Sequence, residues 1–259
     1  GRTITGGFFN TIWGRNNVAD YARGTPAYTN SLSRNPFGLL VDGDNLIIGD
    51  QGNYRVAKFN YVTGLSSDLV GNLYNGDYDD ELTKNANERR YNRPRSLEFD
   101  ATTNSILIND NGNRRIRSME LSTGLVTTRV GRGTNGNSKY DTEDPQDAYF
   151  NNIGDISVSS DGSFLSYVDY NGGSGTNRNC LARVFNTTST TQSVYNKSIP
   201  ANKVNSVAGN FALGCNTWNS GTYNNTQATS SRLHLPVGVT ALNDQSEMYI
   251  TDYNSGCIF

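Results

Sequence analysis

Aspartate followed two or three residues later by asparagine is the pattern in this sequence with the clearest chemical potential. It occurs at Asp50 and Asn53, Asp110 and Asn113, Asp169 and Asn171, and Asp252 and Asn254. Carboxylate and amide oxygens suit Ca²⁺, so a ring of these residues could hold a cation. The same side chains also bond to nearby backbone N–H groups and stabilise tight turns. Because the pattern recurs, whereas a binding site would break the repetition, we expect these residues to be structural turn residues.

Other constellations for catalysis or metal binding are weak. His234 is the only histidine, so neither a histidine-based zinc site nor a Ser-His-Asp triad can be assembled without it. His234 is expected to be a packed or surface residue, and no GxSxG nucleophile elbow occurs. The sequence therefore predicts no catalytic residue, no metal ligand and no cofactor, and it leans away from an enzyme.

Charge is sparse and balanced, with 22 basic and 24 acidic residues and a net charge of −2. A protein held on nucleic acid by phosphate contacts would need a basic face. The segments 89–95 and 113–117 are the only local positive patch, so RNA binding is the least favoured alternative. No run of about 18 apolar residues occurs, and we expect no membrane insertion.

The elements that position these residues come from an internal repeat. Four units align: 35–71, 93–131, 151–209 and 235–259. Each predicts a first apolar strand, a second strand ending in the Asp, and an alternating third strand. A fourth strand ends in Gly in the first three units, at Gly71, Gly131 and Gly209.

The last unit stops before its fourth strand, and the missing piece matches the other end of the chain. TGGFFNTIWG (5–14) aligns with TGLSSDLVG (63–71) and TGLVTTRVG (123–131). A four-stranded antiparallel unit cannot bury its apolar face alone, and radial stacking solves this. We therefore predict an all-β, single-domain β-propeller over 1–259, closed by pairing of the N-terminal strand with the last blade. Four repeats are visible, either as the whole ring or as part of a five- or six-bladed one.

The repeat resembles that of the NHL family of β-propellers. The words that carry the resemblance are PFGLLVD with NLIIGDQGNYRVAKF, PRSLEFD with SILINDNGNRRIRSM, and PVGVTAL with EMYITDYNSGCI. The resemblance implies a propeller fold. The family's peptide-amidation lyase branch looks to rely on a histidine-ligated metal, so with one histidine that activity is not expected here. The third unit departs from the family pattern, because it lacks the proline and carries an insertion at 171–179.

Sequons and cysteines bear on the compartment. Three N-x-[ST] sequons, at Asn186, Asn196 and Asn224, predict N-linked glycans on exposed excursions. Cys215 could pair with Cys257 or with Cys180, and the sequence leaves this choice open. Three reduced thiols in a cytosolic protein remain the alternative. The composition favours secretion to the exterior or the cell surface.

These features lead to two main functional hypotheses. The first is a non-catalytic extracellular interaction or structural module with protein partners, possibly copies of itself in a filament or cell-surface assembly. Fifteen tyrosines favour an interaction surface. The alternative is a propeller enzyme, lyase- or hydrolase-like, with a metal or substrate on the axis.

Overall fold

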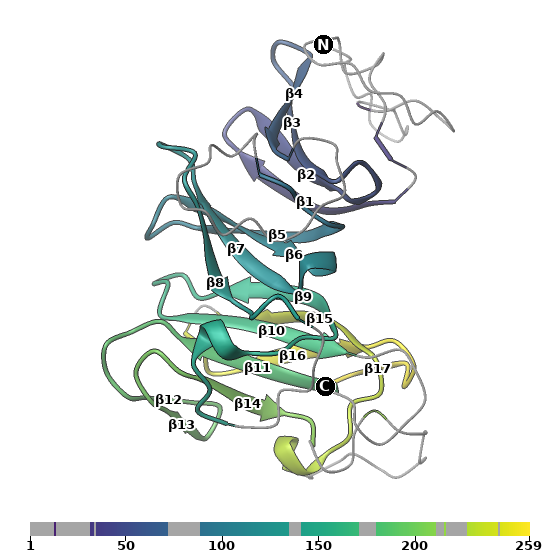
Figure 1. The fold of residues 1–259 in the computed structure, drawn as a ribbon. Helices are drawn as coiled ribbons and strands as arrows, with labels where there is room; N and C mark the ends of the chain where they lie inside the picture. The colour runs from purple at the N-terminus through teal and green to yellow at the C-terminus, as the bar shows by residue number, and fades with distance from the viewer. Residues whose placement is uncertain are drawn as a thin grey trace.

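The computed structural model of this chain consists almost entirely of antiparallel strands (Figure 1). It describes residues 13, 32–33, 35–71, 89–134, 141–170, 180–210, 215, 227–242 and 244–259. Three sheets of four strands, one of three and one of two lie within these residues. None of the helices there is long and apolar enough to cross a membrane. The prediction of an all-β fold built from four repeat units is confirmed.

The sheets follow the four repeat units in order. Blade one contains β1 (Pro36–Asp42), β2 (Asn45–Asp50), β3 (Arg55–Asn60) and β4 (Leu65–Val70). Blade two contains β5 (Pro94–Asp100), β6 (Ser105–Asp110), β7 (Arg115–Glu120) and β8 (Val126–Val130). Blade three contains β9 (Asn152–Val158), β10 (Phe164–Tyr170), β11 (Cys180–Asn186) and β14 (Val204–Ala208), with an added hairpin of β12 (Gln192–Val194) and β13 (Lys197–Ile199). Blade four contains β15 (Pro236–Ala241), β16 (Met248–Asp252) and β17 (Cys257–Ile258). Short 3₁₀ turns lie at Gln51–Asn53, Asn111–Asn113, Pro145–Asp147 and Ala228–Ser230.

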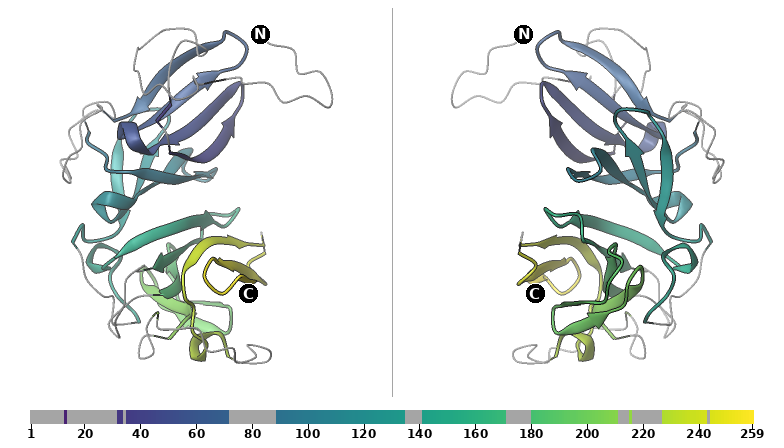
Figure 2. Two further views of the ribbon diagram at one scale, coloured as in Figure 1. Left: turned by 90° about the vertical axis from the view of Figure 1, so that its right-hand side faces the viewer. Right: turned by 90° about the vertical axis from the view of Figure 1, so that its left-hand side faces the viewer.

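The first strands of successive blades lie side by side. β1 packs beside β5, β5 beside β9, and β9 beside β15. The blades follow one another around an arc, with blades one and four at its ends (Figure 2). This is the arrangement of a propeller, in which the first strand of every blade is innermost.

Alternation along the strands explains how each blade packs against two neighbours. In β6, Ile106 and Ile108 join the core shared with blade one, whereas Leu107 joins the core shared with blade three. Successive side chains of a strand point to opposite faces, so a strand buried on both faces is apolar throughout. Val168 and Val239 lie in the third core, between blades three and four.

Each inner strand carries an irregularity near its start, where its pairing with the second strand shifts register. Blades one and two approach one another closely at this point. A Cβ on Gly38 would lie 2.3 Å from the carbonyl oxygen of Arg95, and one on Gly49 would lie 2.4 Å from the same atom. Only glycine fits at these two positions, so the backbone at Arg95 is held in a fixed place.

Ring closure falls mainly outside the described residues, because only Trp13 of the segment 5–14 is described. The Trp13 ring packs 5.6 Å from that of Phe59 on β3. In the repeat, Trp13 corresponds to Val70, which lies in the core between its own blade and the next one. Trp13 therefore contacts blade one as a fourth strand of a preceding blade would. Pairing of this segment with blade four stays a prediction.

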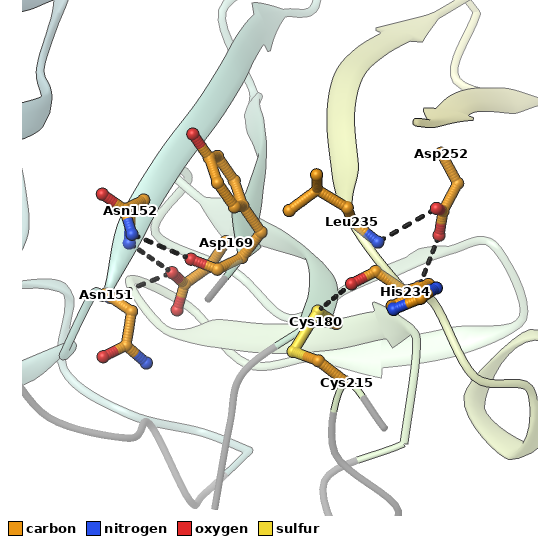
Figure 3. Close-up of a disulfide and its surroundings, with 9 residues drawn as sticks. Asn151, Asn152, Asp169, Cys180, Cys215, His234, Leu235 and Asp252 are labelled. Atoms are coloured by element: carbon orange, nitrogen blue, oxygen red, sulfur yellow. Dashed lines mark hydrogen bonds between the residues drawn. A yellow bond between two sulfur atoms is a disulfide. The ribbon is translucent and has the colours of Figure 1, made fainter. Parts of the chain in front are cut away.

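The structure decides the choice between the two disulfide pairings. Cys180, the first residue of β11, is bonded to Cys215 (Figure 3). Cys257 is free and exposed. Cys215 therefore does not pair with Cys257. The Cys180 sulfur also lies 3.0 Å from the carbonyl oxygen of His234, in the segment that enters β15. The bridge thus fastens the connection between blades three and four to the third strand of blade three.

Candidate active site at the inner strands

The aspartates at the ends of the second strands accept hydrogen bonds from the chain that enters their own blade. The Asp50 carboxylate accepts from the Ser33 backbone N–H at 2.7 Å and from the Asn53 side chain at 2.8 Å, and it pairs with Arg55 at 2.8 Å. Asp50 and Arg55 are both almost fully buried. The carboxylate therefore ties the entry of the blade to its first hairpin.

Asp110 occupies the same position in blade two, although its arginine partner lies two residues further along the third strand. It accepts from the Asn92 N–H at 2.8 Å and from the Asn113 side chain at 2.9 Å, and it pairs with Arg117 at 2.8 Å. Asp169 accepts from the Asn151 N–H at 3.0 Å in the same way (Figure 3).

Blade four follows with Asp252, which accepts from the Leu235 N–H at 3.0 Å and from the Ser255 N–H at 3.2 Å. Asn171 lies outside the described residues, and Asn254 lies in the last turn. Carboxylates occupied by N–H donors and by arginine are what hairpin scaffolding requires.

The arginines of the two basic segments are divided between the interior and the surface. Arg89, Arg115 and Arg117 are 1%, 7% and 0% exposed, respectively. Arg117 pairs with Asp110. Of the other arginines in these segments, Arg90 and Arg93 are exposed and Arg95 and Arg114 are half-buried. The positive patch is thus smaller than the number of arginines in the sequence suggests, and the expectation that nucleic acid is an unlikely partner stays a prediction.

Two carboxylates break the symmetry of the repeat on the inner strands. The pairing of first and second strands shows which inner-strand residues are equivalent in the four blades. The equivalents of Asp155 are small and uncharged, and those of Glu98 are uncharged. The equivalents of Asp155 are Gly38, Ser96 and Gly238, and those of Glu98 are Leu40, Ser157 and Thr240. Sequence reasoning missed both. The signal that could have found them is a charge at a first-strand position where the other units have none.

Asp155 touches the blades on both sides of its own. One carboxylate oxygen accepts from the Val239 N–H of blade four at 3.3 Å, and the other accepts from the Ile156 N–H at 3.0 Å. The Ser96 hydroxyl of blade two also donates to it. Burial raises the pKa of Asp155, and these three donors act in the opposite direction. A residue that reaches both neighbouring inner strands lies where three blades converge.

Glu98 is the second carboxyl group of the pair. Burial, and next the negative charge of Asp155, raise its pKa to about 7, while a hydrogen bond from the Phe99 backbone lowers it. Two interacting carboxyl groups release their protons in separate steps. At neutral pH Glu98 can therefore both hold and release a proton beside Asp155.

A buried amide fixes the strands beneath this pair. Asn109 on β6 is fully buried. Its amide nitrogen donates to the Ser96 hydroxyl at 3.3 Å and to the Ile153 carbonyl at 3.1 Å, which links blade two to blade three. Its oxygen has no hydrogen-bond partner among the residues that the structure describes. Asn109 thus holds Ser96, which in turn donates to Asp155.

Arg95 lies one residue before Ser96. Its guanidinium is centred 4.5 Å from the Phe37 ring of blade one and donates to the Tyr170 hydroxyl of blade three at 2.8 Å. The side chain therefore spans the inner strands at their starting ends.

This arrangement suits proton transfer. A carboxyl group with a pKa near the working pH is an efficient general acid or base, and a pair held at different pKa values is typical of such sites. Across the described ranges, no three His, Cys, Asp or Glu side chains gather into a metal-binding group. The two carboxyl groups supply the proton donor and the proton acceptor that such a transfer needs.

The sequons differ in accessibility. Asn186 is fully buried, and its amide donates to the carbonyls of Thr190 and Ile199, both at 2.9 Å. A glycan on that nitrogen does not fit the folded chain, which argues against the expectation for Asn186. Asn196 is exposed between β12 and β13. Asn224 lies outside the described residues.

Comparison with known proteins gives structural neighbours only. No family model and no curated protein matches the chain. A solved protein of unknown function from Bacteroides thetaiotaomicron has a TM-score of 0.53 and 15% identity, over 85% of this chain and 45% of that chain. A gluconolactonase from Xanthomonas campestris has a TM-score of 0.48 and 11% identity, over 86% and 56%. A putative 6-phosphogluconolactonase from Bacteroides uniformis has a TM-score of 0.49 and 11% identity, over 92% and 53%. The chain spans about half the length of these structures.

None of the three neighbours is described as a structural module, and two are described as lactonases. The expectation of a non-catalytic structural module is therefore replaced by its alternative, a propeller enzyme, which is taken up below as a proposal. At 11–15% identity the likeness shows the fold alone. The activity of this chain therefore has to be argued from its own residues.

Proposed function

We propose that this chain is a hydrolase-like propeller enzyme in which Glu98 transfers protons at the inner strands. The observation that supports the proposal is the half-buried Glu98 carboxyl group, at a position that is uncharged in the other three inner strands. Burial and the charge of Asp155 raise its pKa to about 7. As a carboxylate, Glu98 accepts a proton from a water molecule while the water oxygen attacks the carbonyl carbon of an ester or lactone. The bond from that carbon to the leaving oxygen then breaks, and this oxygen takes the proton from Glu98. Glu98 thereby returns to its starting state.

The pH dependence of hydrolysis tests the proposal. Glu98 must be ionised to act as a base, so kcat/KM should rise with pH, level off above about 7 and fall about tenfold per unit well below it. The measurement is hydrolysis of a panel of small lactones and esters between pH 5 and 9, together with a ¹³C NMR titration of the Glu98 carboxyl group. Absence of turnover across the panel, or a profile without an inflection between pH 6 and 8, would count against it.

We also propose that the protein belongs with the NHL-type propellers. The repeated words on the first three strands of blades one, two and four support this. In each of these blades the Asp that ends the second strand accepts a hydrogen bond from a backbone N–H that lies one to three residues before the proline of the first strand. The departures in blade three coincide with the added β12–β13 hairpin.

Secretion with N-glycosylation is a further part of the proposal. The Cys180–Cys215 disulfide supports an oxidising compartment, and the exposed Asn196 supplies an accessible acceptor. After expression through a eukaryotic secretory pathway, peptide mapping should find a glycan on Asn196 and none on Asn186. The variant Asn196→Gln should lose one glycan mass. A glycan on the Asn186 peptide, or an unmodified Asn196, would contradict this prediction.

A further inference from the structure

We propose that Arg95 binds the anionic group of the substrate, and that the substrate is a small molecule carrying a carboxylate or a phosphate. That the bound molecule is a substrate rests on the proposed function. The anion site itself rests only on the contacts of Arg95, and it can be tested without any turnover.

The charge of Arg95 has no acidic partner among the residues that the structure describes. Other basic residues there do form ion pairs, among them Arg55, Arg117, Arg183, Lys197 and Lys203. Arg95 is half-buried, and its hydrogen bond goes to a neutral hydroxyl, that of Tyr170. A guanidinium has five N–H donors, so most of them remain available. A partly desolvated cation with free donors favours an anion.

The guanidinium is held in place before any ligand arrives. The Phe37 ring supports one face, and the Tyr170 hydroxyl fixes one nitrogen. The backbone beneath is fixed because its carbonyl oxygen fills the space left by Gly38 and Gly49. A side chain already held in position loses little conformational entropy on binding, and its planar fork matches the oxygens of a carboxylate or phosphate.

The position of Arg95 connects this cation to the carboxylate pair. Its repeat equivalents are Phe37, Gly154 and Val237, so blade two alone carries a charge at this position among the four inner strands. Its neighbour Ser96 donates to Asp155. Arg95 and Glu98 are three residues apart on β5, so their Cα atoms lie within about 10 Å. A small molecule can therefore hold its anionic group at Arg95 and its reacting bond near Glu98.

Binding of inorganic phosphate and of acetate, followed by NMR at constant ionic strength, tests this inference. In the ¹⁵N-labelled wild-type chain, either anion should cause a saturable change at the Arg95 Nε–H and the Ser96 amide. Arg95→Lys should bind the preferred anion at least tenfold more weakly, because the fork is lost. Arg95→Gln should not bind it. The tighter-binding probe identifies the anionic group as a phosphate or a carboxylate.

Arg132 provides a matched control. Its guanidinium also donates to a tyrosine hydroxyl, that of Tyr149, at 3.0 Å and stacks 5.4 Å from that ring, but it is exposed and lies outside the inner strands. Arg132→Gln should leave the titration unchanged. The absence of a saturable change with either probe in the wild type would overturn the inference. The same titration in well-folded Arg95→Gln would also overturn it.

The outcomes separate this inference from the proposed function. Binding at Arg95 without hydrolysis of any panel compound supports the anion site and contradicts the enzyme. Hydrolysis of neutral and anionic compounds alike, with their kcat/KM ratio unchanged in Arg95→Gln, supports the enzyme and overturns the anion site.

Discussion

Replacing Glu98 by glutamine is expected to lower kcat/KM by about 10²–10⁴-fold at pH 8, the usual range for loss of a general base. Glutamine has nearly the same shape as glutamate but cannot accept and return a proton. The residual rate should no longer depend on pH near 7. Hydrolysis of the best panel compound by wild type and Glu98→Gln, measured between pH 5 and 9, checks this.

The same variant should not lose stability, and this separates catalysis from folding. The Glu98 pKa is raised from 4.5 in a model peptide to about 7 in the folded chain. The folded state therefore holds a proton that the unfolded state releases, so the folded state becomes less stable as pH rises through this window. Glutamine does not ionise. At pH 8 Glu98→Gln should be more stable than the wild type by about 1–2 kcal/mol, after allowance for solvent screening.

Glu120→Gln is the matched control, because Glu120 ends β7 and bonds to Ser122 and Thr123 in an exposed turn. It should leave kcat/KM unchanged. If Glu98→Gln retained full activity, or if it lost activity only in proportion to a loss of folded protein, Glu98 would not be the base.

Local sequence features were sufficient to predict the blades. Apolar alternation, the Asp at the end of each second strand and the Gly at the end of each fourth specify hairpins within about 40 residues. The repetition of these units then implies stacking. The resulting order of inner strands follows from chain order alone, and the structure shows it.

The candidate site could not be read in the same way, because it depends on contacts between blades. Asp155 acquires its partners from Ser96 in blade two and Val239 in blade four. From the repeat alone, Glu98 is an ordinary position of a first strand. Its pKa is unusual because the folded chain buries it near the charge of Asp155. The disulfide was undecided for a related reason, since Cys215 lies in a long connection whose path the repeat does not specify.

Departures from the repeat mark the residues on which the proposed function rests. Features shared by all blades, such as Asp50 and Asp110, hold hairpins in place through nearly identical bonds. Features found in one blade only, namely Arg95, Glu98 and Asp155, lie on adjacent inner strands. In a scaffold of equivalent units, the positions at which one unit differs from the others are therefore the first candidates for a functional site.

The buried pair Asp110–Arg117 should be the most sensitive point of the scaffold. Both side chains are 0% exposed and their atoms approach to 2.8 Å. Asp110→Asn keeps the shape but leaves the guanidinium buried without this carboxylate, and removing one partner of a buried ion pair costs about 3–5 kcal/mol. The free energy of unfolding of a whole domain is about 5–15 kcal/mol, so the variant should be only marginally stable. Urea denaturation of wild type and Asp110→Asn measures the loss.

A double-mutant cycle with Arg117→Met shows whether the pair itself is responsible. Arg117→Met alone leaves the Asp110 charge buried and should be similarly destabilising, whereas the double variant removes both charges. The double variant should therefore lose less stability than the sum of the two single variants, by about 1–3 kcal/mol. Losses that add to within about 0.5 kcal/mol would show that the two residues act independently. In that case the stability of blade two would come from the backbone hydrogen bonds of Asp110 rather than from its pairing with Arg117.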